Sequence, residues 1–383
     1  REDAKEYHQV SAFGVDATYD SFLSVFADRD DFGAIRLPFD WRKPLTFTAS
    51  TLRDKILETY ESNGRKPVHL MAHSMGGLLV RAALMKYGND LWPKVGRIVF
   101  LGTPHYGSPA IAGYLKNHLW GFELMSLLGL YFNRATFRSL WGVLSMLPAP
   151  IGVYPGTRAQ VDARTTIEHP CANFEMYDAR AWELNLHAND ETRLQKVLDA
   201  AAKFHLSMFD AHKELSQEQR GRMAVIAGVG YSTLFRLEFD SRFWGIWEYT
   251  NKVTKRIPGQ PNREGDGRVP LASATLESIG ALRYVHAKHG DLPGIVQVYE
   301  DAFRWLKSEP MRLPDTVPGA LSQHLAGPLK RTGPNFQETN AAPASADDPG
   351  YWDVSTPDPV RLGELRQQLE AGQLPEFQFL HLL

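Results

Sequence analysis

Apolar positions in the first hundred residues alternate between short continuous runs and runs with helical spacing. The continuous runs at residues 34–39, 68–72 and 97–101 predict buried strands. Between them, apolar residues recur three or four positions apart at residues 52–60 and 78–87, which predicts two helices. A strand–helix–strand alternation of this kind is typical of a mostly parallel sheet covered by helices.

The alternation stops near residue 108. Residues 108–220 are rich in Trp, Leu and Phe at helical spacing, and we interpret them as a helical cap insertion over a site. A helical subdomain that never moves is the plainer alternative. Strand character returns at residues 223–229 and 282–286, and Pro, Gly, Ala and Asp dominate after residue 312. We therefore predict one α/β domain over residues 1–312, followed by a linker and C-terminal extension over residues 313–383.

Composition and charge exclude few classes of protein function. The chain has 383 residues, of which 43% are hydrophobic and 22% charged, as is ordinary for a globular enzyme. A net charge of -2 gives no basic excess, so we expect no nucleic-acid partner. Cys171 is the only cysteine and excludes an intrachain disulfide. The most apolar run, residues 119–132, is shorter than the roughly 20 residues of a membrane-spanning helix.

The strongest chemical signal is AHSMGG at residues 72–77, where a predicted strand runs directly into a predicted helix. It has the form of a G-x-S-x-G nucleophile elbow with Ala72 in place of the first glycine. Such a turn strains the serine backbone, and we expect Gly76 to let the helix pack against the strand. Ser74 is then the candidate nucleophile, with the Met75 backbone N–H as an oxyanion donor. A Ser-Gly turn that only caps a helix is the alternative.

A serine hydroxyl needs a base, and the base needs an acid that orients it. In α/β-hydrolases the chain order is serine, acid, histidine. Asp266, between two glycines, is the candidate acid, although a plain surface turn is also consistent with that pattern. His289 and His286 are both candidate bases, and we prefer His289 because it lies where a strand opens into a loop. For His73 and His105 we expect packing or backbone hydrogen bonds.

Several motifs, in order between about residues 19 and 310, resemble the lecithin:cholesterol acyltransferase family of α/β-hydrolases. They are FDWR at 39–42, AHSMGG at 72–77, LGTPH at 101–105, GDGRVP at 265–270 and HG at 289–290, with MLPAP at 146–150 similar to that family's cap region. The resemblance implies an α/β-hydrolase fold, a mostly parallel sheet with a large helical cap insertion. It also implies lipase, phospholipase or O-acyltransferase chemistry on a lipid-like ester.

The resemblance also assigns residues by position. It makes Ser74, Asp266 and His289 the catalytic triad, with Arg268 in place of the threonine common in that motif. It places the substrate-binding candidates near the site; these are Asp40, Trp41, Arg42 and, in the cap, Trp120. The expected partner is a lipid or other acyl ester, and neither a metal nor an organic cofactor is implied. A transient contact of residues 119–146 with a membrane surface stays open, although packing inside the cap is favoured.

One family feature has no counterpart in the sequence. Family members carry an earlier strand ending in a Pro-Gly loop that supplies a second oxyanion donor, and nothing like it precedes residue 19. We therefore expect N-terminal strands to be missing and this chain to be the downstream part of a longer protein. A catalytically inactive α/β-hydrolase-like binding module is the rival hypothesis from another functional class.

Overall fold

The computed structural model describes residues 31–116, 137–155, 169–170, 175–184, 186–231, 233, 236–240, 246–250 and 265–317. For residues 236–240 and 246–250 only the backbone is described. The substrate-binding candidate Trp120 lies outside these ranges, as does the C-terminal extension after residue 317.

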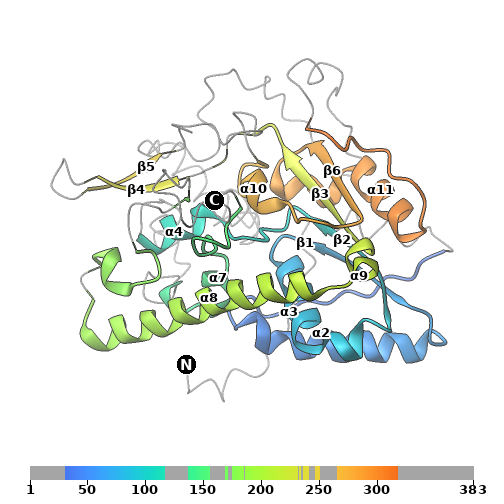
Figure 1. The fold of residues 1–383 in the computed structure, drawn as a ribbon, viewed down its shortest axis with the longest axis horizontal. Coiled ribbons are helices and arrows are strands. Elements are labelled where there is room, and N and C mark those ends of the chain that lie inside the picture. The colour runs from blue at the N-terminus through green and yellow to red at the C-terminus, as the bar shows by residue number, and fades with distance from the viewer. Residues whose placement is uncertain are drawn as a thin grey trace, which may run out of the picture.

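A four-stranded parallel sheet forms the centre of the molecule (Figure 1). Its order is β1 (Val68–His73), β2 (Val95–Leu101), β3 (Met223–Val229) and β6 (Ala281–His286). Each of these strands was predicted within two residues at either end. Together with the helices on both faces, the parallel sheet gives the predicted α/β-hydrolase class of fold.

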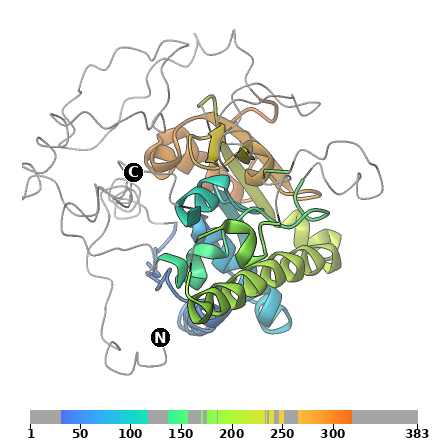
Figure 2. The same cartoon turned by 90° about the vertical axis from the view of Figure 1, so that its left-hand side faces the viewer.

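Helices cover both faces of the sheet because successive side chains of a strand point to opposite faces. In β2, Ile98 and Phe100 pack in one core, whereas Val99 and Leu101 pack in another. The first core is closed by α2 (Leu45–Ser62) and α3 (Met75–Leu91), and the second by α11 (Val296–Leu306). The result is a three-layer arrangement, seen from two sides in Figures 1 and 2.

A third hydrophobic core lies beside the sheet and is helical. It joins α4 (Pro109–Lys116), α7 (Trp141–Leu144), the 3₁₀ helix η3 (Ala179–Trp182) and the first half of α8 (Ala188–Glu214). The second half of α8 packs instead on the sheet domain, through Phe204 and Met208. The long helix therefore fixes the helical subdomain to the sheet, and it runs from the lower left of Figure 1 toward α9.

Two parts of the described chain differ from the sequence-based expectation. Residues 34–39 do not form the predicted buried strand, and Ile35 is exposed. Among the described residues no strand pairs with this segment, and a strand needs a partner for its backbone groups. Conversely, β4 (Arg236–Asp240) and β5 (Ile246–Thr250) form an antiparallel pair that was not predicted. The sequence signal for this pair is the alternation of apolar and polar residues in each segment.

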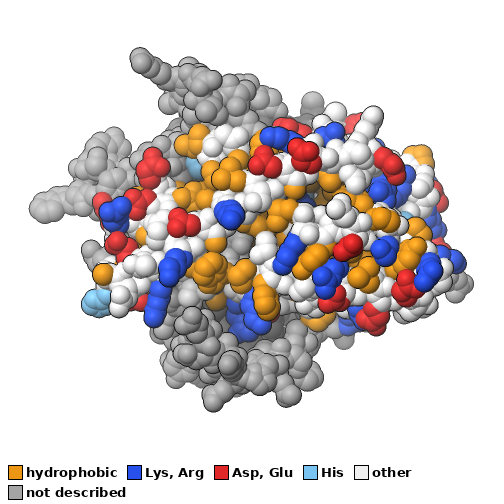
Figure 3. All heavy atoms as spheres, turned by 60° about the horizontal axis from the view of Figure 1, so that its bottom comes forward, with side chains coloured by type: hydrophobic (Ala, Val, Ile, Leu, Met, Phe, Trp, Pro, Cys, Tyr) orange, Lys and Arg blue, Asp and Glu red, His pale blue; other side chains and the backbone are white. Residues whose placement is uncertain are grey.

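The surface carries charges of both signs. Figure 3 shows the face of the molecule below α8 and α2 in Figure 1, where Lys and Arg side chains are interspersed with Asp, Glu and apolar ones. None of the helices in the described ranges is both long enough and apolar enough to cross a bilayer. The described part of the chain therefore presents a mixed surface around a layered core.

Candidate active site

Ser74 lies in the turn between β1 and α3. Its backbone has φ 53° and ψ −129°, a region that residues other than glycine rarely adopt. The turn is fixed on both sides, because Ser74 N donates to Leu101 O (2.9 Å) and Gly77 N donates to Ser74 O (3.0 Å). The strained strand–turn–helix geometry agrees with the elbow predicted from the sequence.

The helix after the turn packs closely on its neighbour through Gly77. A β-carbon placed on Gly77 would lie 2.0 Å from Thr103 Oγ1, so only glycine fits there. A β-carbon on Gly76 would lie 3.9 Å from Ala72 Cβ, which is an ordinary van der Waals contact. The sequence-based expectation therefore named the wrong glycine: Gly77, not Gly76, allows the close approach of α3.

Three side chains that are distant in sequence meet beside this turn. His289 Nε2 lies 2.8 Å from Ser74 Oγ, and His289 Nδ1 lies 2.7 Å from Asp266 Oδ2. A carboxylate only accepts hydrogen bonds, so Nδ1 carries the proton and Nε2 accepts from the serine hydroxyl. The Ser74 hydroxyl, the His289 imidazole and the Asp266 carboxylate are therefore hydrogen-bonded in series, as in general-base activation of a serine.

The turn that carries Asp266 holds the carboxylate firmly. Asp266 is 1% exposed, and its Oδ1 accepts from Arg268 N (2.9 Å) and Val269 N (2.8 Å). Two backbone donors on one oxygen leave Oδ2 free to face the imidazole. His289 begins the 3₁₀ helix η4 (His289–Gly294) and is 7% exposed.

The remaining histidines near the elbow take other places. His73 Nε2 donates to His289 O at 2.9 Å, and its ring centre lies 4.9 Å from that of His289. His286 packs against Tyr231, with 4.8 Å between ring centres. His105 is buried against Phe100, and burial lowers its pKa well below the ordinary value. His73 therefore has the backbone contact that the sequence suggested, and His105 has the packing role.

The predicted oxyanion donor Met75 and the turn at residues 40–42 both lie beside Gly142. Met75 is the first residue of α3, a position whose N–H has no intrahelical acceptor. A β-carbon on Gly142 would lie 3.0 Å from Met75 Cε and 2.2 Å from Trp41 O, so the helical subdomain, Met75 and the 40–42 turn converge. Gly142 N also donates to Arg42 O (3.2 Å).

The side chains of that turn mostly face each other. Arg42 donates to Asp40 through its backbone N (3.1 Å), Nε (2.8 Å) and Nη2 (3.0 Å). The Arg42 guanidinium lowers the pKa of the Asp40 carboxyl by hydrogen bonding. Trp41 between them is 39% exposed. The structure thus brings the 40–42 turn to the edge of the site and leaves the indole at the surface.

Ser273 joins two loops of the site and was not predicted from the sequence. Ser273 lies in the short helix α10 (Leu271–Ala274), its Oγ accepts from Tyr106 N (3.1 Å) and donates to Gly107 O, and its backbone O accepts from His105 N (2.8 Å). The loop after β2 and the segment after Asp266 are thereby held together. A buried serine without a motif around it offers no sequence signal for this role.

Comparison with known proteins gives a family and some distant likenesses. The family model described as Lecithin:cholesterol acyltransferase matches residues 29–276. Over 103 residues, the chain is 28% identical to "Uncharacterized protein YJR098C" of Saccharomyces cerevisiae. That stretch is 26% of this chain and only 15% of the yeast protein.

Solved structures with a similar arrangement are remote in sequence. The structure titled "The crystal structure of Tle4-Tli4 complex" is 16% identical with a TM-score of 0.45, covering 70% of this chain and 65% of that one. The mature Bacillus licheniformis lipase BlEst2 is 17% identical with a TM-score of 0.30, covering 66% and 69%. Likenesses this distant carry no conclusion about chemistry.

Proposed function

The chain belongs to the lecithin:cholesterol acyltransferase family, and on that basis we propose a serine-dependent hydrolase or O-acyltransferase of lipid-like esters. Its catalytic residues are Ser74, His289 and Asp266. One observation carries the proposal: His289 bridges the Ser74 hydroxyl at 2.8 Å and the Asp266 carboxylate at 2.7 Å. A strained serine at a helix N-terminus, with an imidazole and a buried carboxylate aligned behind it, is suited to acyl transfer.

The first half of the reaction forms an acyl-enzyme. His289 Nε2 takes the Ser74 proton while Oγ bonds to the ester carbonyl carbon, and the carbonyl oxygen becomes an oxyanion that the Met75 N–H stabilises. Asp266 stabilises the imidazolium that forms. The tetrahedral intermediate then expels the alcohol, which leaves with the proton from Nε2. Ser74 retains the acyl group.

The second half decides between hydrolysis and transfer. His289 accepts a proton from an incoming hydroxyl, whose oxygen attacks the acyl carbon, and the Ser74 oxygen leaves and regains a proton from Nε2. With water the product is a free acid, and with an alcohol it is a new ester. The triad serves both reactions, so the acceptor that reaches the site determines the activity.

The helical subdomain and Trp41 lie beside the site. Residues of the helical subdomain border the site, since Ser108 N donates to Met146 O (2.7 Å) and Ala149 N donates to Tyr106 O (2.9 Å). Trp41 offers an exposed aromatic surface at the same edge. We assign the subdomain as a cap, and Asp40, Trp41, Arg42 and Trp120 as residues that contact the substrate or support its loop.

Labelling with a fluorophosphonate probe tests the nucleophile. The probe forms a bond to an activated serine, so the wild-type protein should be labelled and Ser74→Ala should not. Ser50→Ala, which removes an exposed serine hydroxyl on α2, is the matched control and should keep full labelling. Undiminished labelling of Ser74→Ala would remove the proposal, and an unlabelled wild-type protein would favour the inactive binding module.

A second experiment separates hydrolase from transferase. A panel of lipid esters is incubated with the protein, with and without an added long-chain alcohol, and both free acid and new ester are measured. A hydrolase releases acid at a rate that the alcohol barely changes. An acyltransferase converts the acid signal into ester as the alcohol concentration rises.

A further inference from the structure

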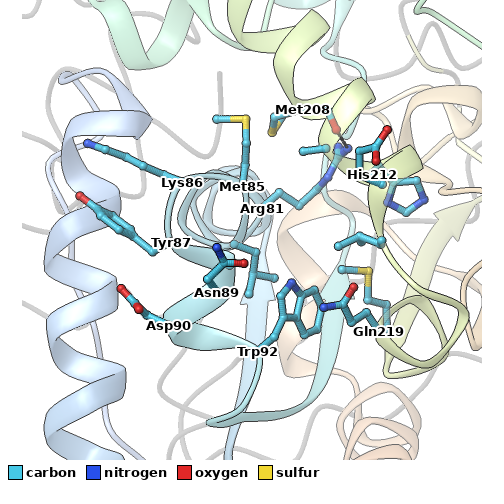
Figure 4. A pocket seen from close by; sticks show the side chains of 16 residues that line it. Arg81, Met85, Lys86, Tyr87, Asn89, Asp90, Trp92, Met208, His212 and Gln219 are labelled. Carbon is cyan, nitrogen blue, oxygen red and sulfur yellow. Dashed lines mark hydrogen bonds between the residues drawn. The ribbon is translucent and has the colours of Figure 1, made fainter.

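A cavity of about 570 Å³ lies between the second half of α3, the end of α8 and the short helix α9 (Gln217–Gly221), as Figure 4 shows. None of the candidate catalytic residues lines it. Residues 84–90 of α3 do, and at about 1.5 Å per residue they lie roughly 15–24 Å along the helix from Ser74. The cavity is therefore separate from the candidate active site, and its volume is within the range of about 300–1,000 Å³ usual for small-molecule sites.

Arg81 brings a buried positive charge to this cavity (Figure 4). The residue is 6% exposed, and its guanidinium donates to His105 O (3.1 Å) and Met208 O (3.3 Å). Among the described residues no carboxylate pairs with it, and burial lowers its pKa. A buried cation without an opposite charge is costly, so an anion bound beside it would be stabilised strongly.

The other charged side chains around the cavity make no ion pair with Arg81 among the described residues. Of the described lining residues, Lys86, Asp90 and Glu214 are exposed, where water and salt screen them. His212 has its pKa lowered by burial and is neutral at pH 7, so it adds no charge. The buried charge on the cavity wall is therefore the Arg81 guanidinium, whereas the carboxylates of the lining are exposed.

The rest of the wall has an apolar side and a polar side that includes Tyr87, Asn89 and Gln219. The apolar side is adaptable. It includes the side chains of Leu84, Met85, Met208, Trp92 and Met223. Methionine is unbranched and polarisable, so a wall with three of them accommodates apolar chains of varied shape. A single cationic group at the buried end of such a wall is complementary to a molecule with one anionic head and an apolar body.

We propose that this cavity binds an amphipathic anion, a carboxylate or a phosphate monoester on an apolar chain, with its head group on Arg81. Guanidinium N–H groups match the paired oxygens of a carboxylate or a phosphate. Arg81 has five N–H donors, and its two bonds to carbonyl oxygens leave three of them for a ligand. The inference stands on the cavity and on Arg81, and it does not depend on the function proposed for Ser74.

Isothermal titration calorimetry on the full chain tests the site. The Ser74→Ala protein is titrated with decanoate, decyl phosphate, decanol and inorganic phosphate, each below its aggregation limit. We expect one of the two anionic amphiphiles to bind at one site per chain, and the stronger of them identifies the head group. Decanol lacks the anionic head group and inorganic phosphate lacks the apolar chain, so each should bind about tenfold more weakly or worse.

Variants locate the binding on the molecule. Ala211→Trp fills the cavity from α8 and should abolish binding, whereas Leu206→Trp, at an exposed position of the same helix, should leave it unchanged. Arg81→Gln should weaken the anions about tenfold or more and leave decanol unaffected. The proposal is wrong if neither anionic amphiphile binds, or if both bind folded Ala211→Trp and Arg81→Gln with wild-type affinity.

Discussion

Asp266 and His289 are joined twice: His289 Nδ1 donates to Asp266 Oδ2 (2.7 Å), and His289 N donates to Asp266 O (2.8 Å). The second bond belongs to the backbone, so it persists whatever happens to the two side chains. The Asp266 carboxylate is also held by its own turn, through Arg268 N and Val269 N. The ring of His289 is therefore placed toward Ser74 by the fold as well as by the carboxylate.

Asp266→Asn should separate orientation from charge. The backbone bond keeps His289 in place, but a neutral amide cannot stabilise an imidazolium, so we expect kcat to fall by about 10⁴-fold with an unchanged circular dichroism spectrum. Steady-state hydrolysis of a chromogenic ester gives kcat.

Asp301→Asn is the matched control for that substitution. Asp301 is also buried, and its carboxylate accepts from Arg312 N and Leu313 N at the far side of α11. Its loss should lower the melting temperature and leave kcat of the folded protein unchanged. Equal losses of kcat in both variants would mean that Asp266 has only a structural role.

Gly102→Ala should displace the Asp266 carboxylate. Gly102 has φ +54°, and an added β-carbon would lie 2.6 Å from Leu292 Cδ1 and 3.1 Å from Asp266 Oδ2. Strain of this kind costs about 1–3 kcal/mol, and displacement of the carboxylate should lower kcat by about 10²-fold. Gly64→Ala has a similar φ of +74° but open space around it, so stability alone should fall. Urea unfolding and ester hydrolysis distinguish the two; an unchanged kcat in Gly102→Ala contradicts this prediction.

Ser273→Ala should loosen the contact between two loops of the site. The substitution leaves Tyr106 N and Gly107 O without their side-chain partner in a buried place. We expect the free energy of unfolding to fall by about 1–3 kcal/mol, whereas Ser50→Ala should change it by less than about 0.5 kcal/mol. Equal stability of the two variants in urea would show that the contact contributes little.

Two buried histidines should make the protein sensitive to acid. Burial lowers the pKa of His205 from 6.5 to about 4, and it lowers that of His105 in the same direction. Between pH 6.5 and about 4 the unfolded chain binds a proton at His205 that the folded chain does not, so stability falls as the pH falls. The loss from His205 approaches about 3 kcal/mol, and above pH 6.5 this residue has no effect.

Urea unfolding at several pH values between 7.5 and 4.5 measures this dependence. His205→Gln removes the titrating group, so its stability should change less with pH than that of the wild-type protein. A parallel decline in the two proteins would show that other groups govern the acid sensitivity.

The sheet was predictable where a local pattern determined burial. The run at Met223–Val229 is continuously apolar because both faces of β3 are covered, and its bounds were predicted correctly. The same pattern at residues 34–39 gave a wrong strand prediction. A strand also requires a neighbouring strand, and the sequence does not show which segments pair. The β4–β5 pair alternates with period two and was overlooked.

The candidate site was predictable to the extent that chemistry leaves motifs. The elbow sequence and the order serine, acid, histidine pointed to Ser74, Asp266 and His289, and the fold brings these three side chains together. Their catalytic roles stay predictions. Ser273, Gly77 and Gly102 could not be identified in advance, because each matters through a contact with a segment distant in the chain.

Mass spectrometry of the acyl-enzyme identifies the residue that carries the acyl group. The protein is mixed with p-nitrophenyl butyrate, quenched in acid during turnover and digested with trypsin. We predict one butyryl group on the side chain of Ser74 in the wild-type protein, and no such adduct in Ser74→Ala. If the protein hydrolyses the ester, the Ser74→Ala variant turns over at the wild-type rate and the acyl group is on another residue, then Ser74 is not the nucleophile.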